Sequence, residues 1–171
     1  FGGITGTKRA DADADVILNG QSANDVFGRS VASAGDFNGD GKDDVIVGAD
    51  LDDNNSLAQS GSAFIFFGGI TGTKTADADA DVILDGQNSG DRFGYSLASA
   101  GDFNGDGTSD IIVHARSDDN NSESASGSAF IFFSSGAFPS ITFSDTTSTQ
   151  SESTTSVTIP VTLSKTSSST V

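Results

Sequence analysis

Oxygen-bearing side chains alternate along residues 36–44, whose sequence is DFNGDGKDD. Carboxylate or carboxamide groups stand at positions 1, 3, 5 and 9 of this stretch, and a glycine stands at position 6. Hard cations such as Ca²⁺ take about six to eight oxygen ligands, often from one tightly turning loop. Gly41 permits the positive φ that such a turn needs. The stretch predicts a calcium loop whose ligands are Asp36, Asn38, Asp40, Asp44 and the backbone carbonyl of Lys42.

The same pattern recurs at residues 102–110, whose sequence is DFNGDGTSD. We call residues 36–44 the first loop and residues 102–110 the second loop. Each loop is expected to hold one Ca²⁺, so the chain would hold two. The predicted ligands of the second loop are Asp102, Asn104, Asp106, Asp110 and the backbone carbonyl of Thr108.

Two other interpretations compete with a structural calcium loop. An EF-hand needs a bidentate acid at position 12, but this position holds Val47 and Val113, both in predicted strands, so an EF-hand is excluded. The other interpretation is a metal-free hairpin loop rich in Asn, Asp and Gly. Three carboxylates on one short loop repel each other without a cation, and both copies keep the same ligand set, which favours the metal.

The strongly negative charge of the chain argues against partners that are themselves negatively charged. It has 24 acidic against 8 basic residues and a formal net charge of −16, which two bound Ca²⁺ would bring only to −12. Such a chain cannot neutralise phosphates, which argues against nucleic acid, and an anionic membrane surface is equally unsuitable. The chain has no cysteine for disulfides and no apolar run of about 18 residues that would span a membrane. No basic-then-apolar leader begins it, and its start resembles a cut through a repeat.

An internal repeat with a period of 66 residues dominates the sequence. Residues 1–66 and 67–132 are identical at 49 of 66 aligned positions. Such similarity predicts one structural unit used twice. We expect units at 1–66 and 67–133, followed by a separate Ser/Thr-rich β segment at 134–171.

Each unit is expected to form four short strands separated by turns. In the first unit these strands cover residues 15–18, 27–34, 44–47 and 62–67. The segments VIV and FIFF are continuous apolar runs, typical of strands buried on both faces, and no segment has a sustained helical period. We predict an all-β protein built of four-stranded antiparallel propeller blades, rather than a two-sheet sandwich with alternating strands.

Acidic residues outside the loops have simpler interpretations. Aspartate alternates with alanine in residues 11–15 and 77–81, where a strand would place the acids on one solvated face; an auxiliary cation site is the alternative. Asp25 and Asp91 each stand two residues before a Phe-Gly pair and are expected to stabilise a turn.

The residues around each loop resemble the FG-GAP repeat. The resemblance rests on Phe27-Gly28, on residues 34–41 and 44–49, and on their equivalents in residues 93–115. FG-GAP repeats build the β-propellers of integrin α subunits and many bacterial surface proteins, which implies one Ca²⁺ per repeat between two blade strands. Where that family often has Gly-Ala-Pro, this chain has Gly48-Ala49-Asp50 in the first copy and His114-Ala115-Arg116 in the second. Two blades cannot close a ring, so we expect a window on a longer protein or assembly with copies of itself.

Residues 134–171 leave the repeat and are rich in serine and threonine. Period-2 alternation at 140–143 and 156–163 predicts strands there. This segment more weakly resembles the opening strands of a Calx-β domain, a β-sandwich in which acidic residues bind Ca²⁺. The resemblance implies such a role for Glu152.

The side chains present point away from catalysis. The chain has no cysteine and one histidine, His114, found in one repeat only, whereas a catalytic metal usually has a histidine ligand and an open position. We expect a non-enzymatic, calcium-stabilised, extracellular segment of a cell-surface or adhesion protein that binds a protein or glycan ligand. The alternative is a structural subunit of an extracellular fibre or sheath, assembled from copies of itself through edge strands. A third is a secreted hydrolase whose catalytic part lies outside this sequence.

Overall fold

The computed structural model describes residues 6–53, 56–120, 122–134, 141–143 and 161–163. The chain divides into two compact units, residues 1–136 and 137–171, and each is described by itself. No helix among the described residues has the length and apolar character needed to cross a membrane.

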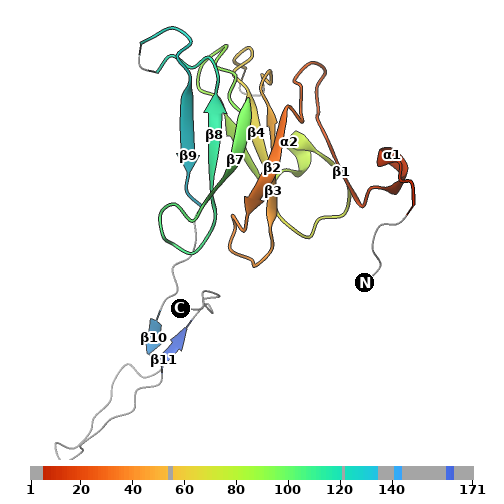
Figure 1. Cartoon of the computed structure of the whole chain (residues 1–171), viewed down its shortest axis with the longest axis vertical. Helices are drawn as coiled ribbons and strands as arrows, with labels where there is room; N and C mark the ends of the chain where they lie inside the picture. The colour runs from red at the N-terminus through yellow and green to blue at the C-terminus, as the bar shows by residue number, and fades with distance from the viewer. Residues whose placement is uncertain (1–5, 54–55, 121, 135–140, 144–160, 164–171) are drawn as a thin grey trace, which may run out of the picture. The chain divides into compact units, whose positions relative to one another are not determined.

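Two antiparallel sheets lie side by side in the first unit (Figure 1). The first has the strand order β2-β3-β4-β6, with β2 (Ser30–Gly35), β3 (Asp44–Ala49), β4 (Ser62–Phe66) and β6 (Val82–Asp85). The second has the order β7-β8-β9, with β7 (Ser96–Gly101), β8 (Asp110–Ala115) and β9 (Ser128–Phe132). The prediction of an all-β fold with antiparallel propeller blades is confirmed.

The first sheet takes its fourth strand from the second sequence unit. β6 pairs with β4, with Leu84 opposite Ala63 and Ile83 opposite Phe64. Its counterpart in the first sequence unit, β1 (Val16–Asn19), pairs instead in parallel with β5 (Gly72–Thr75). The sheet in space is therefore offset by one strand from the repeat in the sequence. The boundaries at residues 66 and 133 remain a prediction about sequence units.

Apolar residues pack against both faces of β4, as its continuous apolar run predicted, whereas Val31 in β2 and Val45 in β3 are exposed. Every residue of β4 is buried. One core cluster joins the two sheets and includes Ile65 and Ile111, and the other lies on the opposite face around Phe64 and Phe66. Since burying one such side chain contributes about 1.5–3 kcal/mol, packing of the sheets against each other supplies much of the stability of this unit.

Glycines let the two sheets approach closely at the second Phe-Gly pair. A Cβ on Gly48 would lie 2.1 Å from the carbonyl oxygen of Gly94. Any other residue at this position would therefore force the backbone to shift. Gly94 has φ +81°, which glycine adopts at little cost, and its carbonyl accepts a 2.8 Å hydrogen bond from the Ser30 hydroxyl. At the position equivalent to Gly48, His114 packs edge-on against Tyr95, with ring centroids 6.1 Å apart.

The segments in which aspartate alternates with alanine form single helical turns, so the expectation of strands there was wrong. These turns are α1 (Ala10–Asp13) and α2 (Ala76–Asp79). In each, the last aspartate accepts a hydrogen bond from the N–H four residues earlier, at 2.9 Å from Arg9 to Asp13 and at 2.8 Å from Thr75 to Asp79. Aspartate favours such local bonds to the backbone, and they close a turn where alternation alone predicted a strand.

In the second compact unit, residues 137–171, the described residues form two short strands. β10 (Ile141–Phe143) pairs antiparallel with β11 (Val161–Leu163). Both lie within the segments where alternation predicted strands. Glu152 lies outside the described residues, so its role and the resemblance to a Calx-β domain stay predictions.

Candidate metal centres

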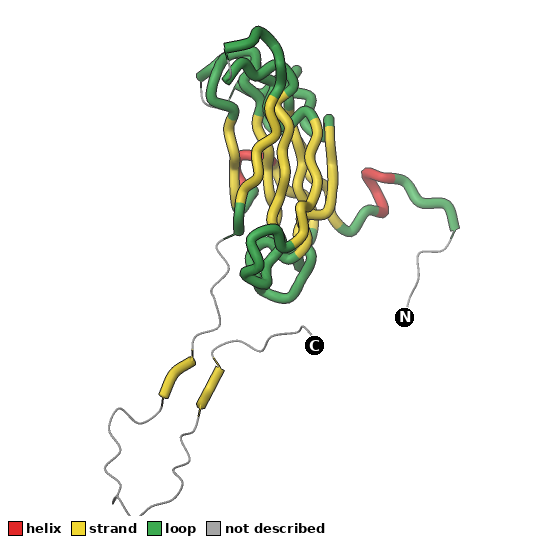
Figure 2. Tube along the Cα trace, turned by 60° about the vertical axis from the view of Figure 1, so that its left-hand side comes forward, coloured by secondary structure: helices red, strands yellow, loops and turns green. Residues whose placement is uncertain are grey.

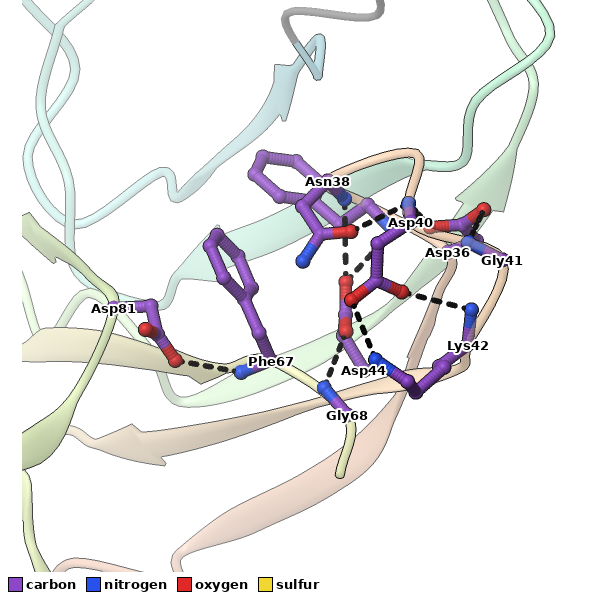
Figure 3. A network of polar contacts seen from close by, with 10 residues as sticks. Asp36, Asn38, Asp40, Gly41, Lys42, Asp44, Phe67, Gly68 and Asp81 are labelled. Atoms are coloured by element: carbon purple, nitrogen blue, oxygen red, sulfur yellow. Dashed lines mark hydrogen bonds and ion pairs between the residues drawn. The ribbon is translucent and has the colours of Figure 1, made fainter. Parts of the chain in front are cut away.

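The first loop connects two neighbouring strands of the first sheet, β2 and β3 (Figure 3). A shift of register between Ser33 and Gly35 marks an irregularity where β2 enters the loop. The second loop lies in the same place between β7 and β8, with the same shift between Ser99 and Gly101. The repeat therefore puts both loops at equivalent ends of their sheets.

Asp44 closes the first loop and is buried. Its Oδ2 accepts hydrogen bonds from the backbone N–H groups of Phe37 at 2.9 Å and Asn38 at 3.2 Å. Its Oδ1 accepts one from the N–H of Gly68 at 2.7 Å. Asp44 thus joins the loop to the segment after β4, and these charge-assisted bonds offset the cost of burying its carboxylate.

Asp36 and Asn38 share a donor within the loop. The N–H of Asp40 donates to Asp36 Oδ1 at 2.9 Å and to Asn38 Oδ1 at 2.8 Å. The N–H of Gly41, a residue with φ +88°, donates to Asp36 Oδ2 at 2.9 Å. Because one N–H reaches both oxygens, the Asp36 and Asn38 side chains lie on the same side of the loop backbone (Figure 3).

The second loop repeats these contacts. The N–H of Asp106 donates to Asp102 Oδ1 at 2.9 Å and to Asn104 Oδ1 at 2.8 Å. The carboxylate of Asp110 accepts hydrogen bonds from the N–H groups of Phe103, Asn104 and Ser134, at 2.9, 3.2 and 3.0 Å. Since the geometry recurs in both copies, the shared loop sequence is enough to set it.

A lysine distinguishes the first loop from the second. The Lys42 ammonium donates to Asp40 Oδ2 at 3.0 Å. Hydrogen bonds from the Lys42 side chain and then from its backbone hold the pKa of Asp40 below its usual value. Thr108 has the equivalent position in the second loop, and its hydroxyl contacts the side chains of Asp106 and Ser134. The first loop therefore places a positive charge beside a predicted cation ligand, where the second has a neutral hydroxyl.

The donors of both loops fit a hard cation, because every side-chain ligand offers oxygen. A carboxylate oxygen has more than one acceptor site, so an oxygen that accepts one N–H can also bind an ion. The loop carboxylates are nevertheless turned toward the backbone. Within the described ranges, the three carboxylates of neither loop bring their oxygens within 4.8 Å of one another. The ligand set of each loop stays a prediction.

Two other groups of carboxylates do come that close. In each group, one oxygen from each of three aspartates lies within 4.8 Å of the other two. The groups are equivalent under the 66-residue repeat. The first acidic cluster is Asp25, Asp52 and Asp53, and the second acidic cluster is Asp91, Asp118 and Asp119.

The acidic clusters lie at the ends of the sheets opposite to the loops. Asp25 precedes the Phe-Gly pair that leads into β2, and Asp52 and Asp53 follow β3. Since β2 and β3 are antiparallel, the start of one meets the end of the other away from the first loop, and Figures 1 and 2 show loops gathered at both ends of the strands. The N–H of Leu51 donates to the Asp25 carbonyl at 3.3 Å, which holds these two segments together.

Burial and repulsion from neighbouring aspartates raise the pKa values of three cluster carboxyls, those of Asp25, Asp52 and Asp91. Burial is the largest cause for Asp52, whose pKa rises to about 6; a hydrogen bond with Ser62 opposes the rise and the charge of Asp25 adds to it. Burial is also the largest cause of the raised pKa values of Asp25 and Asp91. The charged neighbours that add to these rises are other aspartates. The clusters are therefore short of compensating positive charge.

Neither acidic cluster was predicted from the sequence. The turn role expected of Asp91 is present, because its Oδ2 accepts the N–H of Asn88 at 3.1 Å. One signal in the sequence was the pair Asp52-Asp53, which recurs as Asp118-Asp119. Both copies keep this pair although the two residues before it change from Asp-Leu to Arg-Ser. What the sequence could not indicate is that residue 25 meets residue 52, because this contact depends on the pairing of β2 with β3.

Comparison with known families agrees with the sequence resemblance. Residues 27–66 and 93–132 match the model of the FG-GAP repeat. Each matched segment begins at a Phe-Gly pair and includes one calcium-type loop and the Asp-Asp pair of one acidic cluster.

Named relatives match across most of the chain. Integrin alpha-5 of Xenopus laevis is 31% identical over 136 residues, which cover 77% of this chain and 12% of the integrin. Integrin alpha-PS5 of Drosophila melanogaster is 34% identical over 119 residues, which cover 70% of this chain and 11% of the integrin. Phosphatidylinositol-glycan-specific phospholipase D of Rattus norvegicus is 32% identical over 123 residues, which cover 67% of this chain and 14% of that protein. The chain spans about one eighth of the length of these relatives.

Proposed function

Because the chain carries two FG-GAP repeats and is similar to integrin alpha chains, we propose that it is a non-enzymatic, calcium-stabilised segment of an extracellular adhesion protein. Each loop would hold one Ca²⁺ through the oxygens of its positions 1, 3, 5, 7 and 9. The packed blades would then present a surface to a protein or glycan ligand at a cell surface.

The observation that carries the proposal is the closure of both loops by a buried aspartate. Asp44 and Asp110 each accept three backbone N–H groups, two from the loop and one from the segment after the third blade strand. These bonds hold each loop in its turn without any ion. A preorganised loop loses little entropy on binding, and a bound Ca²⁺ would offset the repulsion among its three carboxylates.

One relative is by name a phospholipase, which raises the alternative of an enzyme. Nucleophilic catalysis needs a nucleophile activated by a neighbouring base. The chain has no cysteine, and its one histidine, His114, packs edge-on against Tyr95. We therefore assign this segment a binding role and place any hydrolytic site outside it.

Unfolding with and without calcium tests the calcium part of the proposal. A site with a dissociation constant of about 10⁻⁴–10⁻³ M would stabilise the fold by about 1.5–3 kcal/mol in about 10 mM CaCl₂ relative to EDTA. Asp40→Asn combined with Asp106→Asn should remove the share of this gain that the loops supply. The matched control is Asp43→Ser, which gives the first loop the serine of residue 109 and removes no predicted ligand. Equal calcium-dependent gains in the wild-type chain and the double variant would contradict calcium binding by the loops.

Attachment of cells tests the adhesion part. Cells are expected to attach to plastic coated with the folded chain in calcium and to detach in EDTA. Attachment no greater than to albumin-coated plastic would contradict an adhesive role for this segment.

A second candidate function, a subunit that assembles through its edge strands, is favoured by the offset between repeat and sheet. β4 takes β6 as its outer neighbour, but among the strands of the described ranges none pairs with the outer edge of β9. β1 has nearly the sequence of β6, VILN against VILD, and lies outside both blade sheets. β1 of a second copy would complete the second sheet as β6 completes the first.

Light scattering at several concentrations tests this second candidate. Chains that assemble head to tail should gain mass with concentration, and Ile17→Pro should prevent this because proline removes an N–H from the strand. Ile17→Thr is the control, since it keeps the N–H and a β-branched side chain. A monomer at every concentration would exclude this mode of assembly.

A further inference from the structure

We propose that the first and second acidic clusters each bind a divalent hard cation, with Ca²⁺ favoured, at the end of the blades opposite to the loops. The proposal goes beyond the calcium loops and does not depend on them, because it concerns other residues at the other end of each sheet.

Buried oxygens without a partner mark both clusters as incomplete. Asp52 is 1% exposed and Asp118 is 0% exposed. In each, Oδ2 is buried and has no hydrogen-bond partner, although buried polar groups are almost always hydrogen-bonded. An unpaired buried oxygen carries the full cost of losing its water. A cation bound among the oxygens of the cluster would supply the missing partner.

The unpartnered carboxylates face the other members of their clusters. One oxygen of each member lies within 4.8 Å of the others. Ionised carboxylates at such distances repel one another, and a divalent ion between them converts this repulsion into attraction.

Basic side chains do not neutralise the clusters in the part of the chain that the structure describes. The ion pairs found there join Lys8, Lys42 and Lys74 to aspartates outside the clusters. Arg29 and Arg116 lie over the ring of Tyr95, at 4.6 and 5.2 Å from its centroid. The negative charge of the clusters is thus left for a partner from solution.

A fourth acid makes the first cluster the stronger of the two sites. The charge of Asp77, in α2, raises the pKa values of both Asp25 and Asp52, so this carboxylate lies near them. The N–H of Asp77 donates to Gln21 Oε1 at 3.0 Å, which holds α2 against the segment that precedes Asp25. The sequence repeat stops before residue 134, so it supplies no equivalent of Asp77 to the second cluster.

Amides partly satisfy the second cluster instead. Gln87 Nε2 donates to Asp118 Oδ1 at 3.5 Å, and Asn88 Nδ2 donates to Asp91 Oδ2 at 3.2 Å. These neutral donors compete with a cation for the same oxygens. We therefore expect the first cluster to bind Ca²⁺ more tightly than the second.

The donor set of the clusters favours Ca²⁺ among divalent cations. All of these side-chain ligands are carboxylates. They come from separate segments, before β2 and after β3 in the first cluster and before β7 and after β8 in the second. Ca²⁺ accepts irregular sets of about six to eight oxygens, whereas Mg²⁺ demands near-octahedral geometry. Metals that prefer sulfur or imidazole have no suitable ligand here.

Counting bound Ca²⁺ tests the proposal on the full chain. Native mass spectrometry in CaCl₂ is expected to find one ion for each cluster, in addition to any ions in the loops. Asp52→Asn with Asp118→Asn keeps the shape of both clusters and should lower the count by two. Asp40→Asn with Asp106→Asn instead removes ions bound by the loops, so failure of the loops and failure of the clusters give different results. An unchanged count in the Asp52→Asn, Asp118→Asn variant would overturn the proposal.

A second variant and a control guard against a simple loss of folding. Asp53→Asn with Asp119→Asn alters exposed members of the clusters and should weaken Ca²⁺ binding there about tenfold without disturbing the core. Asp50→Asn is the control, because Asp50 is 2% exposed and also has a buried unpaired oxygen but belongs to neither cluster. Its ion count should equal that of the wild-type chain. An equal fall in the control would overturn the proposal, since loss would then follow from removing any buried charge.

Discussion

Each end of the β2–β3 hairpin buries an aspartate, but backbone N–H groups fully hydrogen-bond only one of the two carboxylates. Asp44 and Asp52 are both 1% exposed. Asp44 accepts three backbone N–H groups, whereas Asp52 Oδ2 has no hydrogen-bond partner. Burial alone therefore does not decide whether a carboxylate stabilises this fold, because the donors around it determine the balance.

The contrast follows from the course of the chain at each end. In the loop, a tight turn with glycines at positive φ directs N–H groups inward toward the carboxylates. At the cluster end, the N–H groups of Leu51 and Asp52 are bound to the carbonyl oxygens of Asp25 and Ala49. The Asp44 carboxylate is thus fully hydrogen-bonded without an ion, whereas the Asp52 carboxylate keeps a buried oxygen that a cation could bind.

The largest effect is expected from Asp44→Ala. Three backbone N–H groups would lose a charged acceptor, and each such loss costs about 1–3 kcal/mol when the group is buried. We expect the free energy of unfolding to fall by about 3–5 kcal/mol, measured by urea denaturation in EDTA. Asp43→Ala, at an exposed position of the same loop, is the control and should change stability by less than about 0.5 kcal/mol. A loss below about 1 kcal/mol for Asp44→Ala would remove the contrast between the two ends.

The sequence predicted the loop end well because its signal is local. The pattern of residues 36–44 lies on one continuous turn, and a second copy repeats it. The buried role of Asp44 follows from the same pattern, although its bond to Gly68 does not, because that bond depends on how β3 pairs with β4.

The cluster end could not be predicted because its residues are far apart in the sequence. Asp25 and Asp52 are brought together only when β2 pairs with β3, and Asp77 approaches only because β6 joins the first sheet from the next unit. Alternation of aspartate and alanine was also misleading around Asp77, since local hydrogen bonds to the backbone outweigh a period of two in a four-residue segment.

In the absence of calcium, Asp52→Asn is expected to raise the free energy of unfolding, whereas Asp44→Ala lowers it. The carboxamide has the same shape, removes a buried charge beside Asp25 and can donate a hydrogen bond to it. We expect the metal-free chain to become more stable by about 1 kcal/mol, measured by urea denaturation in EDTA. Asp44→Asn under the same conditions should destabilise the chain, because it weakens charge-assisted bonds. If both substitutions changed stability in the same direction, the two ends would not differ in the way described.

The smallest effect separates the two loops from each other. Lys42→Thr gives the first loop the residue of the second and removes the ammonium that lies 3.0 Å from Asp40 Oδ2. Since an exposed ion pair contributes little, Ca²⁺ affinity of the first loop should rise only about two- to fivefold. Thr108→Lys should lower the affinity of the second loop by a similar factor. Titration with CaCl₂ in a chain carrying Asp52→Asn and Asp118→Asn isolates the loops, and both effects should shrink at high salt because screening weakens the ion pair. Unchanged affinity in both variants would mean that the lysine does not compete with the ion, and the two loops would then be equivalent in function as well as in backbone geometry.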